Sequence, residues 1–291
     1  MSLVRIFVIA LLITSCVHKS ALEKNSDKDR LSELAMEKKS ISIEGEQRTY
    51  SVVVPNNVDS LKGIFFLFHG SNGSGTEFSK GIGFNEKVIK ENYIAVYPDA
   101  PIGNWAEGCN CNNADRLEIK DLEFIDGIMD SLTSEYKIVD EKNYAIGFSQ
   151  GGLFTQRLAC ERSKKFDGFA VIAANMSKPL SVNCTPESKV SQLIIQGKFD
   201  KVLNYEGSDN GALSLLSAKE TIEFWAEQNE CGLETKKVDE TNSNISVTTY
   251  CNEDKQSNLK LVTILTGVHS WFFYGINTNE EIINFLLNKG G

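Results

Sequence analysis

Short apolar runs alternate with longer amphipathic segments along most of the chain. GIFFLFHG (63–70), which glycines bound, is typical of a strand that is buried on both faces of a sheet. RTYSVVVP (48–55) alternates and ends at a proline, which indicates a half-buried strand. The expected strands are 48–55, 63–70, 94–100, 143–149, 169–175, 192–200 and 259–267, and the expected helices are roughly 76–91, 117–136, 150–163, 216–229 and 278–288.

Buried strands that alternate with helices predict a mostly parallel central sheet with helices on both faces. We find no internal repeat and no linker that would divide residues 41–291, so the sequence predicts one α/β domain there. Functional sites of open α/β sheets form at the carboxyl ends of the strands. We therefore expect the catalytic residues at those positions.

The first 40 residues differ from this pattern. Residues 1–16 have Arg5 in a short first segment and continue into an apolar run, 6–13, that is too short to span a bilayer, as in a signal peptide. Ile13-Thr14-Ser15-Cys16 resembles a bacterial lipobox, which predicts lipidation of Cys16 and a membrane-held protein of the bacterial cell envelope. The alternative is an ordinary secretory signal in which Cys16 is incidental. Residues 17–40 are polar and predict a tether, with a short helix near 29–38.

Composition narrows the function classes. The chain has 291 residues, of which 41% are hydrophobic and 24% charged, and this is ordinary for a globular protein. Its net charge of −9 and the lack of a basic stripe argue against nucleic acid as a partner.

Seven cysteines are present, and setting Cys16 aside leaves six behind an export signal, which indicates disulfides. Two of them, Cys231–Cys251, bracket a polar segment and form the first expected pair. The second expected pair is Cys160–Cys184. Cys109 and Cys111 remain, and a bridge between residues so close in sequence would be strained. Zinc is the alternative for these two, but no second CxxC or histidine pair accompanies them, so we expect no metal.

The segment GFSQGG (147–152) contains G-x-S-x-G between an expected strand and an expected helix. That context is the nucleophile elbow of hydrolases, in which a tight turn exposes the serine hydroxyl. Ser149 is therefore the candidate nucleophile. The alternative is a glycine-rich turn with an idle serine.

A nucleophilic serine needs a base, and the chain has three histidines. His18 lies in the tether, and His69 follows the strand at 63–70. His269 follows the last expected strand, which fits the hydrolase order of serine, acid, histidine. We expect His269 to be the base and His69 to shape its loop. The alternative for His269 is a loop histidine that packs against Trp271.

The acid that orients the histidine should follow a strand between the serine and the histidine. QLIIQGKFD (192–200) places Asp200 there, where it would hold the imidazole tautomer. Asp167 precedes its strand and Asp209 lies in a polar loop, so both are worse placed. The alternative for Asp200 is a turn-capping role.

An oxyanion hole needs N–H donors near the serine. One is expected from Gln150, which follows the nucleophile, and one from Ser71 in the loop HGSNGSG (69–75), with Gly70 next. Trp105 and Trp271 are expected to wall the substrate site. The alternative for each is a tryptophan packed in a loop base without substrate contact.

The same motifs carry a resemblance to a known family. RTYSVVVP, FFLFHGSNGSG, YAIGFSQGG, IIQGKFDKVLNY and GVHSWF resemble the polyhydroxybutyrate depolymerase/feruloyl esterase-type family of secreted α/β-hydrolases, over roughly 45–289. The resemblance implies an α/β-hydrolase fold, a triad of Ser149, Asp200 and His269, and ester hydrolysis without metal or cofactor. The segment GKFD, Gln150 and Phe272 depart from the usual family residues.

We therefore expect an exported, lipid-anchored serine esterase. Its expected partners are a small or polymeric ester and a membrane, and its expected substrates are short hydroxyacyl oligoesters or feruloyl and acetyl esters. The alternatives are a non-catalytic surface binding protein and a peptidase on the same fold.

Overall fold

One mixed sheet of ten strands organises the described residues, which are 36–209, 213–233, 236–251 and 257–287 of the computed structural model. The strand order is β1-β2-β4-β3-β5-β6-β7-β10-β9-β8. The strands are β1 (Glu37–Ile43), β2 (Glu46–Val53), β3 (Leu61–Phe68), β4 (Ile94–Pro98), β5 (Ile138–Phe148), β6 (Gly168–Ile172), β7 (Gln192–Gly197), β8 (Lys237–Asn242), β9 (Ile245–Tyr250) and β10 (Leu259–Ile264).

Strand direction separates the centre of the sheet from its two sides. From β4 to β10, each neighbouring pair is parallel, which gives these six strands a common carboxyl edge. The pairs at the two sides, β1–β2, β2–β4, β10–β9 and β9–β8, are antiparallel. The expected parallel centre with helices around it is confirmed, and the sheet as a whole is mixed.

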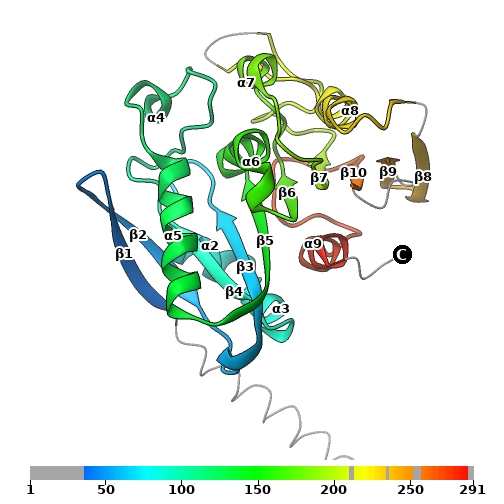
Figure 1. Ribbon diagram of the computed structural model, residues 1–291. Helices are drawn as coiled ribbons and strands as arrows, with labels where there is room; N and C mark the ends of the chain where they lie inside the picture. The colour runs from blue at the N-terminus through cyan, green and yellow to red at the C-terminus, as the bar shows by residue number, and fades with distance from the viewer. Residues whose placement is uncertain (1–35, 210–212, 234–235, 252–256, 288–291) are drawn as a thin grey trace, which may run out of the picture. The chain divides into compact units, whose positions relative to one another are not determined.

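Helices cover both faces of the sheet (Figure 1). On one face, α6 packs against β3, β5 and β6, and α5 and α8 share the same apolar core. On the other face, α2 and α3 contact β4, and α9 contacts β6 and β7. The helices are α2 (Gly75–Ile82), α3 (Asn85–Lys90), α4 (Asn113–Arg116), α5 (Asp121–Glu135), α6 (Gln150–Glu161), α7 (Lys178–Asn183), α8 (Ala218–Gln228) and α9 (Thr278–Leu286), with 3-10 turns η1 (Val58–Ser60) and η2 (Ser163–Lys165).

Alternation along β3 shows why both faces are apolar. Phe66 and Phe68 point to the α6 side, where Phe68 meets Phe154 at 5.1 Å between ring centroids. Phe65 points to the opposite side and meets Tyr144 at 4.7 Å. A continuous apolar run therefore fills two cores at once, as the sequence predicts for a doubly covered strand.

Several expected boundaries differ from the structure. The expected helix 76–91 is two helices, because Gly83 takes a left-handed conformation (φ +59°) that ends α2. Residues 37–40, which we placed at the end of the tether, instead begin β1, and the expected helix near 29–38 is therefore wrong at its last two residues. The remainder of that helix, the signal peptide, His18 and Cys16 lie outside the described residues.

β1 and the β8–β9 hairpin were not anticipated. β1 alternates between exposed and half-exposed residues, and β8 (KVDETN) is polar, so neither has the apolar run of a central strand. Both lie at a side of the sheet, where one face of a strand suffices for packing. No helix within the described residues has the length and apolarity that crossing a bilayer requires.

The described residues contain three disulfides. Cys160–Cys184 and Cys231–Cys251 are the two pairs expected from the sequence. Cys109–Cys111 closes a very short loop, with the two Cα atoms 5.1 Å apart.

Candidate active site

Ser149 occupies the turn between β5 and α6. Its backbone has φ +54° and ψ −122°, a conformation that non-glycine residues rarely adopt. The turn holds because the Ser149 N–H donates to the Ile172 carbonyl at 2.9 Å and the Ser149 carbonyl accepts the Gly152 N–H at 2.8 Å. Strain of this kind at a strand–turn–helix junction is typical of a nucleophile elbow.

Two glycines of the elbow are required by close packing. A side chain at Gly147 would place its Cβ 2.1 Å from the Gly151 carbonyl oxygen. A side chain at Gly151 would place its Cβ 2.3 Å from the Phe68 carbonyl oxygen, at the end of β3. The motif therefore lets α6 begin directly against β3, which aims the helix N-terminus at the space beside Ser149.

Three side chains from three strand ends meet at this point. His269 Nε2 lies 2.9 Å from Ser149 Oγ, and His269 Nδ1 lies 2.7 Å from Asp200 Oδ2. A carboxylate only accepts hydrogen bonds, so Nδ1 carries the proton and Nε2 is free to accept the serine proton. The structure thus brings together the three residues that the sequence singles out.

The carboxylate of Asp200 is held from its other oxygen. Asp200 Oδ1 accepts the N–H groups of Val202 at 2.8 Å and Leu203 at 3.0 Å, and the carboxylate is fully buried. The loops that carry Asp200 and His269 are joined by the Phe199 N–H, which donates to the Gly267 carbonyl at 2.8 Å. Asp200 therefore has both of the roles considered for it, because one oxygen caps a turn and the other orients the imidazole.

The competing acids are placed elsewhere. Asp167 pairs with Lys142 and accepts the Asn143 N–H at 3.0 Å. Asp209 pairs with Lys178 and is exposed. Neither has a contact with His269 among the described residues.

His69 has both ring nitrogens engaged. Its Nε2 accepts the Ala100 N–H at 3.2 Å, so Nδ1 carries the proton and donates to the Gly70 carbonyl at 2.7 Å. Burial lowers the pKa of His69, which keeps the ring neutral. His69 is therefore a part of the loop architecture, as the sequence predicts.

The segments that carry the two expected oxyanion donors run beside Ser149. A Cβ at Gly70 would lie 3.2 Å from the Ser149 Cβ, so the loop after β3 runs directly beside the nucleophile. Within the part of the chain that the structure describes, the N–H groups of Ser71 and Gln150 have no acceptor. Both groups are free to donate to a bound oxygen.

The two tryptophans expected at the substrate site are buried. Trp105 has no exposed surface and packs between Phe68 and Phe154. Trp271 is 4% exposed, and its indole donates to Asn279 Oδ1 at 2.8 Å while its ring packs against Phe78. The expected substrate contact is wrong for Trp105 and unsupported for Trp271, because buried rings leave no surface for a ligand.

Exposed apolar side chains that lie close in sequence to two triad residues were not singled out from the sequence. They follow or precede Asp200 and His269 within a few positions and are Phe199, Val202, Val268, Phe272 and Tyr274. Phe272 is 63% exposed and Tyr274 is 88% exposed. Sequence proximity to the triad could have identified them, but exposure cannot be read from an aromatic residue alone.

One side-chain cluster has metal-ligand chemistry. Glu107, Cys109 and Cys111 place their ligand atoms within 4.8 Å of one another. The two sulfurs are bonded to each other, however, so neither is a thiolate that could bind a metal. The cluster is a disulfide beside a buried carboxyl group.

No protein-family model matches the chain. It is 23% identical to "Putative esterase NocK" of Nocardia uniformis subsp. tsuyamanensis, over 79% of this chain and 72% of that protein. It is 24% identical to Feruloyl esterase B of Piromyces equi, over 62% of this chain and 34% of that protein. Acetyl xylan esterase from Aspergillus awamori superposes with a TM-score of 0.61 at 14% identity, over 86% of this chain and 98% of the other.

The two sequence relatives confirm the expected resemblance and the expected enzyme class, carboxylic ester hydrolase. The chain spans only about a third of the length of Feruloyl esterase B. The solved structure, at 14% identity, establishes the fold. The chain thus has the α/β-hydrolase fold and is similar in sequence to proteins named as esterases, feruloyl esterases among them.

Proposed function

We propose that the chain is a serine esterase that hydrolyses carboxylic esters through a Ser149–His269–Asp200 triad. The observation that carries the proposal is the continuous hydrogen-bond relay from a strained serine to a buried carboxylate. A non-catalytic binding protein would have no need of this strain or of the relay, since both cost stability.

The reaction has two halves. Ser149 Oγ attacks the ester carbonyl carbon as its proton moves to His269 Nε2, and the carbonyl oxygen becomes an oxyanion that the Gln150 and Ser71 N–H groups stabilise. The carbon–oxygen bond to the alcohol breaks, and the alcohol leaves with the proton from Nε2. Water then attacks the acyl-enzyme by the same route, which releases the acid and restores Ser149.

The acyl group is proposed to be short or aromatic. The relatives are named for feruloyl and acetyl xylan esters, and short hydroxyacyl oligoesters belong to the same chemistry. Phe272 and Tyr274 follow His269 within five positions, and their exposed rings would offer an apolar surface to such a group. An open surface binds a compact or flat acyl chain better than a long flexible one, because ordering each extra rotatable bond costs entropy.

The test combines labelling with a substrate panel. A fluorophosphonate probe should label the wild-type protein and leave Ser149→Ala unlabelled. Acetate, butyrate, palmitate, 3-hydroxybutyrate-oligomer and ferulate esters, with a peptide amide alongside, should then be ranked by kcat/KM. Absence of labelling would favour the binding protein, and turnover of the peptide above that of each ester would favour the peptidase.

We also propose that the protein is exported and held at the bacterial cell envelope by lipid on Cys16. The signal-like pattern of residues 1–16 and the three disulfides support export, because disulfides persist in oxidising compartments. Two or more acyl chains suffice for stable anchoring. Mass spectrometry of the mature N-terminus and the membrane fraction of Cys16→Ala test this; an unchanged mass and an unchanged membrane fraction would contradict it.

A further inference from the structure

Trp105 is bonded to both sides of the expected oxyanion hole. It lies in the loop between β4 and α4 and has no exposed surface. Its backbone contacts the side chain of Gln150, and its indole contacts the backbone of His69. These two partners belong to the segments that carry the two expected donors, so a single buried residue connects them.

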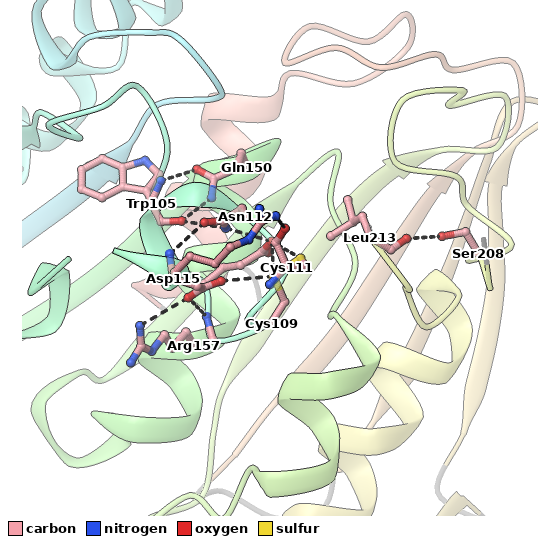
Figure 2. Close-up of a disulfide and its surroundings, with 12 residues drawn as sticks. Trp105, Cys109, Cys111, Asn112, Asp115, Gln150, Arg157, Ser208 and Leu213 are labelled. Atoms are coloured by element: carbon pink, nitrogen blue, oxygen red, sulfur yellow. Dashed lines mark hydrogen bonds and ion pairs between the residues drawn. A yellow bond between two sulfur atoms is a disulfide. The ribbon is translucent and has the colours of Figure 1, made fainter. Parts of the chain in front are cut away.

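The first connection is a reciprocal pair of hydrogen bonds. The Trp105 N–H donates to Gln150 Oε1 at 2.8 Å, and Gln150 Nε2 donates to the Trp105 carbonyl at 2.7 Å, as Figure 2 shows. The side-chain amide of Gln150 therefore has both its oxygen and its NH₂ group bonded to the backbone of one residue. Because Gln150 is the first residue of α6, this holds the backbone N–H that follows Ser149.

The second connection runs through the indole. Trp105 Nε1 donates to the His69 carbonyl at 3.0 Å, immediately before Gly70 and Ser71. The ring is wedged between Phe154, which is stacked on it at 5.1 Å, and Phe68, which meets it edge-on at 5.4 Å between centroids. The hydrogen bond and the packing together fix where the loop after β3 leaves the strand.

The loop that carries Trp105 is itself anchored. Asn112 Nδ2 donates to the Trp105 carbonyl at 3.1 Å, and the Ala106 N–H donates to the buried Asp121 carboxylate at 2.7 Å. Arg157 of α6 donates to the Ala106 carbonyl at 2.8 Å. Trp105 therefore cannot shift without breaking bonds to α5, to α6 and to its own loop.

We propose that Trp105 is a positioning residue, which sets the Gln150 and Ser71 N–H groups at a common distance from the oxygen that develops charge. The proposal rests on the proposed esterase function. An oxyanion hole works only when its donors are prearranged 2.7–3.1 Å from the charged oxygen, and loss of one donor costs about 10²–10³ in kcat. A residue that holds both donors should affect kcat far more than KM.

The test compares two equivalent tryptophan substitutions. Trp105→Phe keeps an aromatic ring but removes the indole N–H bond to His69. Trp225→Phe is the matched control, because Trp225 is also fully buried and donates its indole N–H, at 2.8 Å, to Gln156, two turns along α6 from the elbow. We expect Trp105→Phe to lose about 10-fold or more in kcat, with KM within about twofold, and Trp225→Phe to keep the wild-type kcat at a similar loss in Tm.

A second variant tests the other connection. Gln150→Met keeps the length of the side chain and the backbone N–H of residue 150 but removes both side-chain bonds to Trp105. That N–H is then no longer held in position, so this variant too should lower kcat. For both variants, the inhibition constant of phenylboronic acid, whose adduct on Ser149 places an oxygen in the hole, should rise by the same factor as kcat falls.

The outcomes separate this inference from the proposed function. If wild-type protein hydrolyses p-nitrophenyl acetate, and Ser149→Ala does not, the esterase function stands independently of Trp105. Equal kcat for Trp105→Phe and Trp225→Phe, or a wild-type kcat in Gln150→Met, would then overturn the positioning role. An inactive wild-type protein would count against the esterase function itself.

Discussion

Replacing Asp200 by Asn tests the triad at its most informative bond. In the wild-type structure, the carboxylate accepts the His269 Nδ1 proton, which leaves Nε2 as an acceptor for Ser149. The substituted amide can keep its oxygen on the Val202 and Leu203 N–H groups, and its NH₂ then faces Nδ1. Nδ1 must become the acceptor, so the proton moves to Nε2 and the imidazole can no longer accept from Ser149.

The size of the effect follows from this change of tautomer. Loss of the acid in a serine triad lowers kcat by about 10³–10⁴, or about 4–5.5 kcal/mol of transition-state stabilisation at 1.36 kcal/mol per decade. Because the two backbone bonds and the volume of the side chain are retained, Tm should stay close to that of the wild-type protein. The loss should therefore be confined to the chemical step.

The assay is steady-state hydrolysis of p-nitrophenyl acetate, with Tm from thermal unfolding on the same samples. Asp209→Asn is the control, because Asp209 is exposed and pairs with Lys178 away from the histidine. We expect it to keep the wild-type kcat. If Asp200→Asn retained more than about a tenth of the wild-type kcat, the tautomer argument would be refuted.

Three further predictions concern the second histidine, a buried acid and the exposed rim. His269→Ala should be nearly inactive, whereas His69→Ala should lose less kcat and more Tm because its ring only bonds the backbone; a dead His69 variant beside an active His269 variant would reverse these roles. Burial, and then the charge of Asp115, raises the pKa of Glu107 from 4.5 to about 8. The contribution of Glu107 to stability is therefore complete below pH 4.5 and is lost as pH rises towards about 8. Glu107→Gln should flatten the fall in Tm between pH 5 and 9, and an unchanged slope of Tm against pH would disprove the raised pKa of Glu107. Phe272→Ser should raise KM for ferulate esters by about threefold to tenfold and leave Tm unchanged, and equal KM values would remove this ring from the acyl site.

Much of the fold and of the candidate site could be predicted from local sequence. Apolar runs such as residues 63–70 identify central strands, because a strand covered on both faces needs apolar side chains at each position. That Ser149, Asp200 and His269 meet was predictable because each follows a parallel strand, and parallel strands bring their carboxyl ends to one edge of the sheet. The need for glycine in the elbow was equally predictable, since the turn tolerates no side chain at those positions.

Only the tertiary structure decided the role of residues whose partners are distant in sequence. Trp105 was expected at the substrate site, but Phe68 and Phe154 close over it from β3 and α6, and a loop sequence carries no sign of that burial. The tautomer of His69 depends on a bond from the Ala100 N–H, which lies 31 residues away. β1 has too little apolar character to be recognised alone, because it gains its hydrogen bonds from β2 at a side of the sheet and needs few apolar contacts. Periodicity reports the environment of a residue's own element, whereas burial, protonation and hydrogen-bond partners depend on the elements that pack against it.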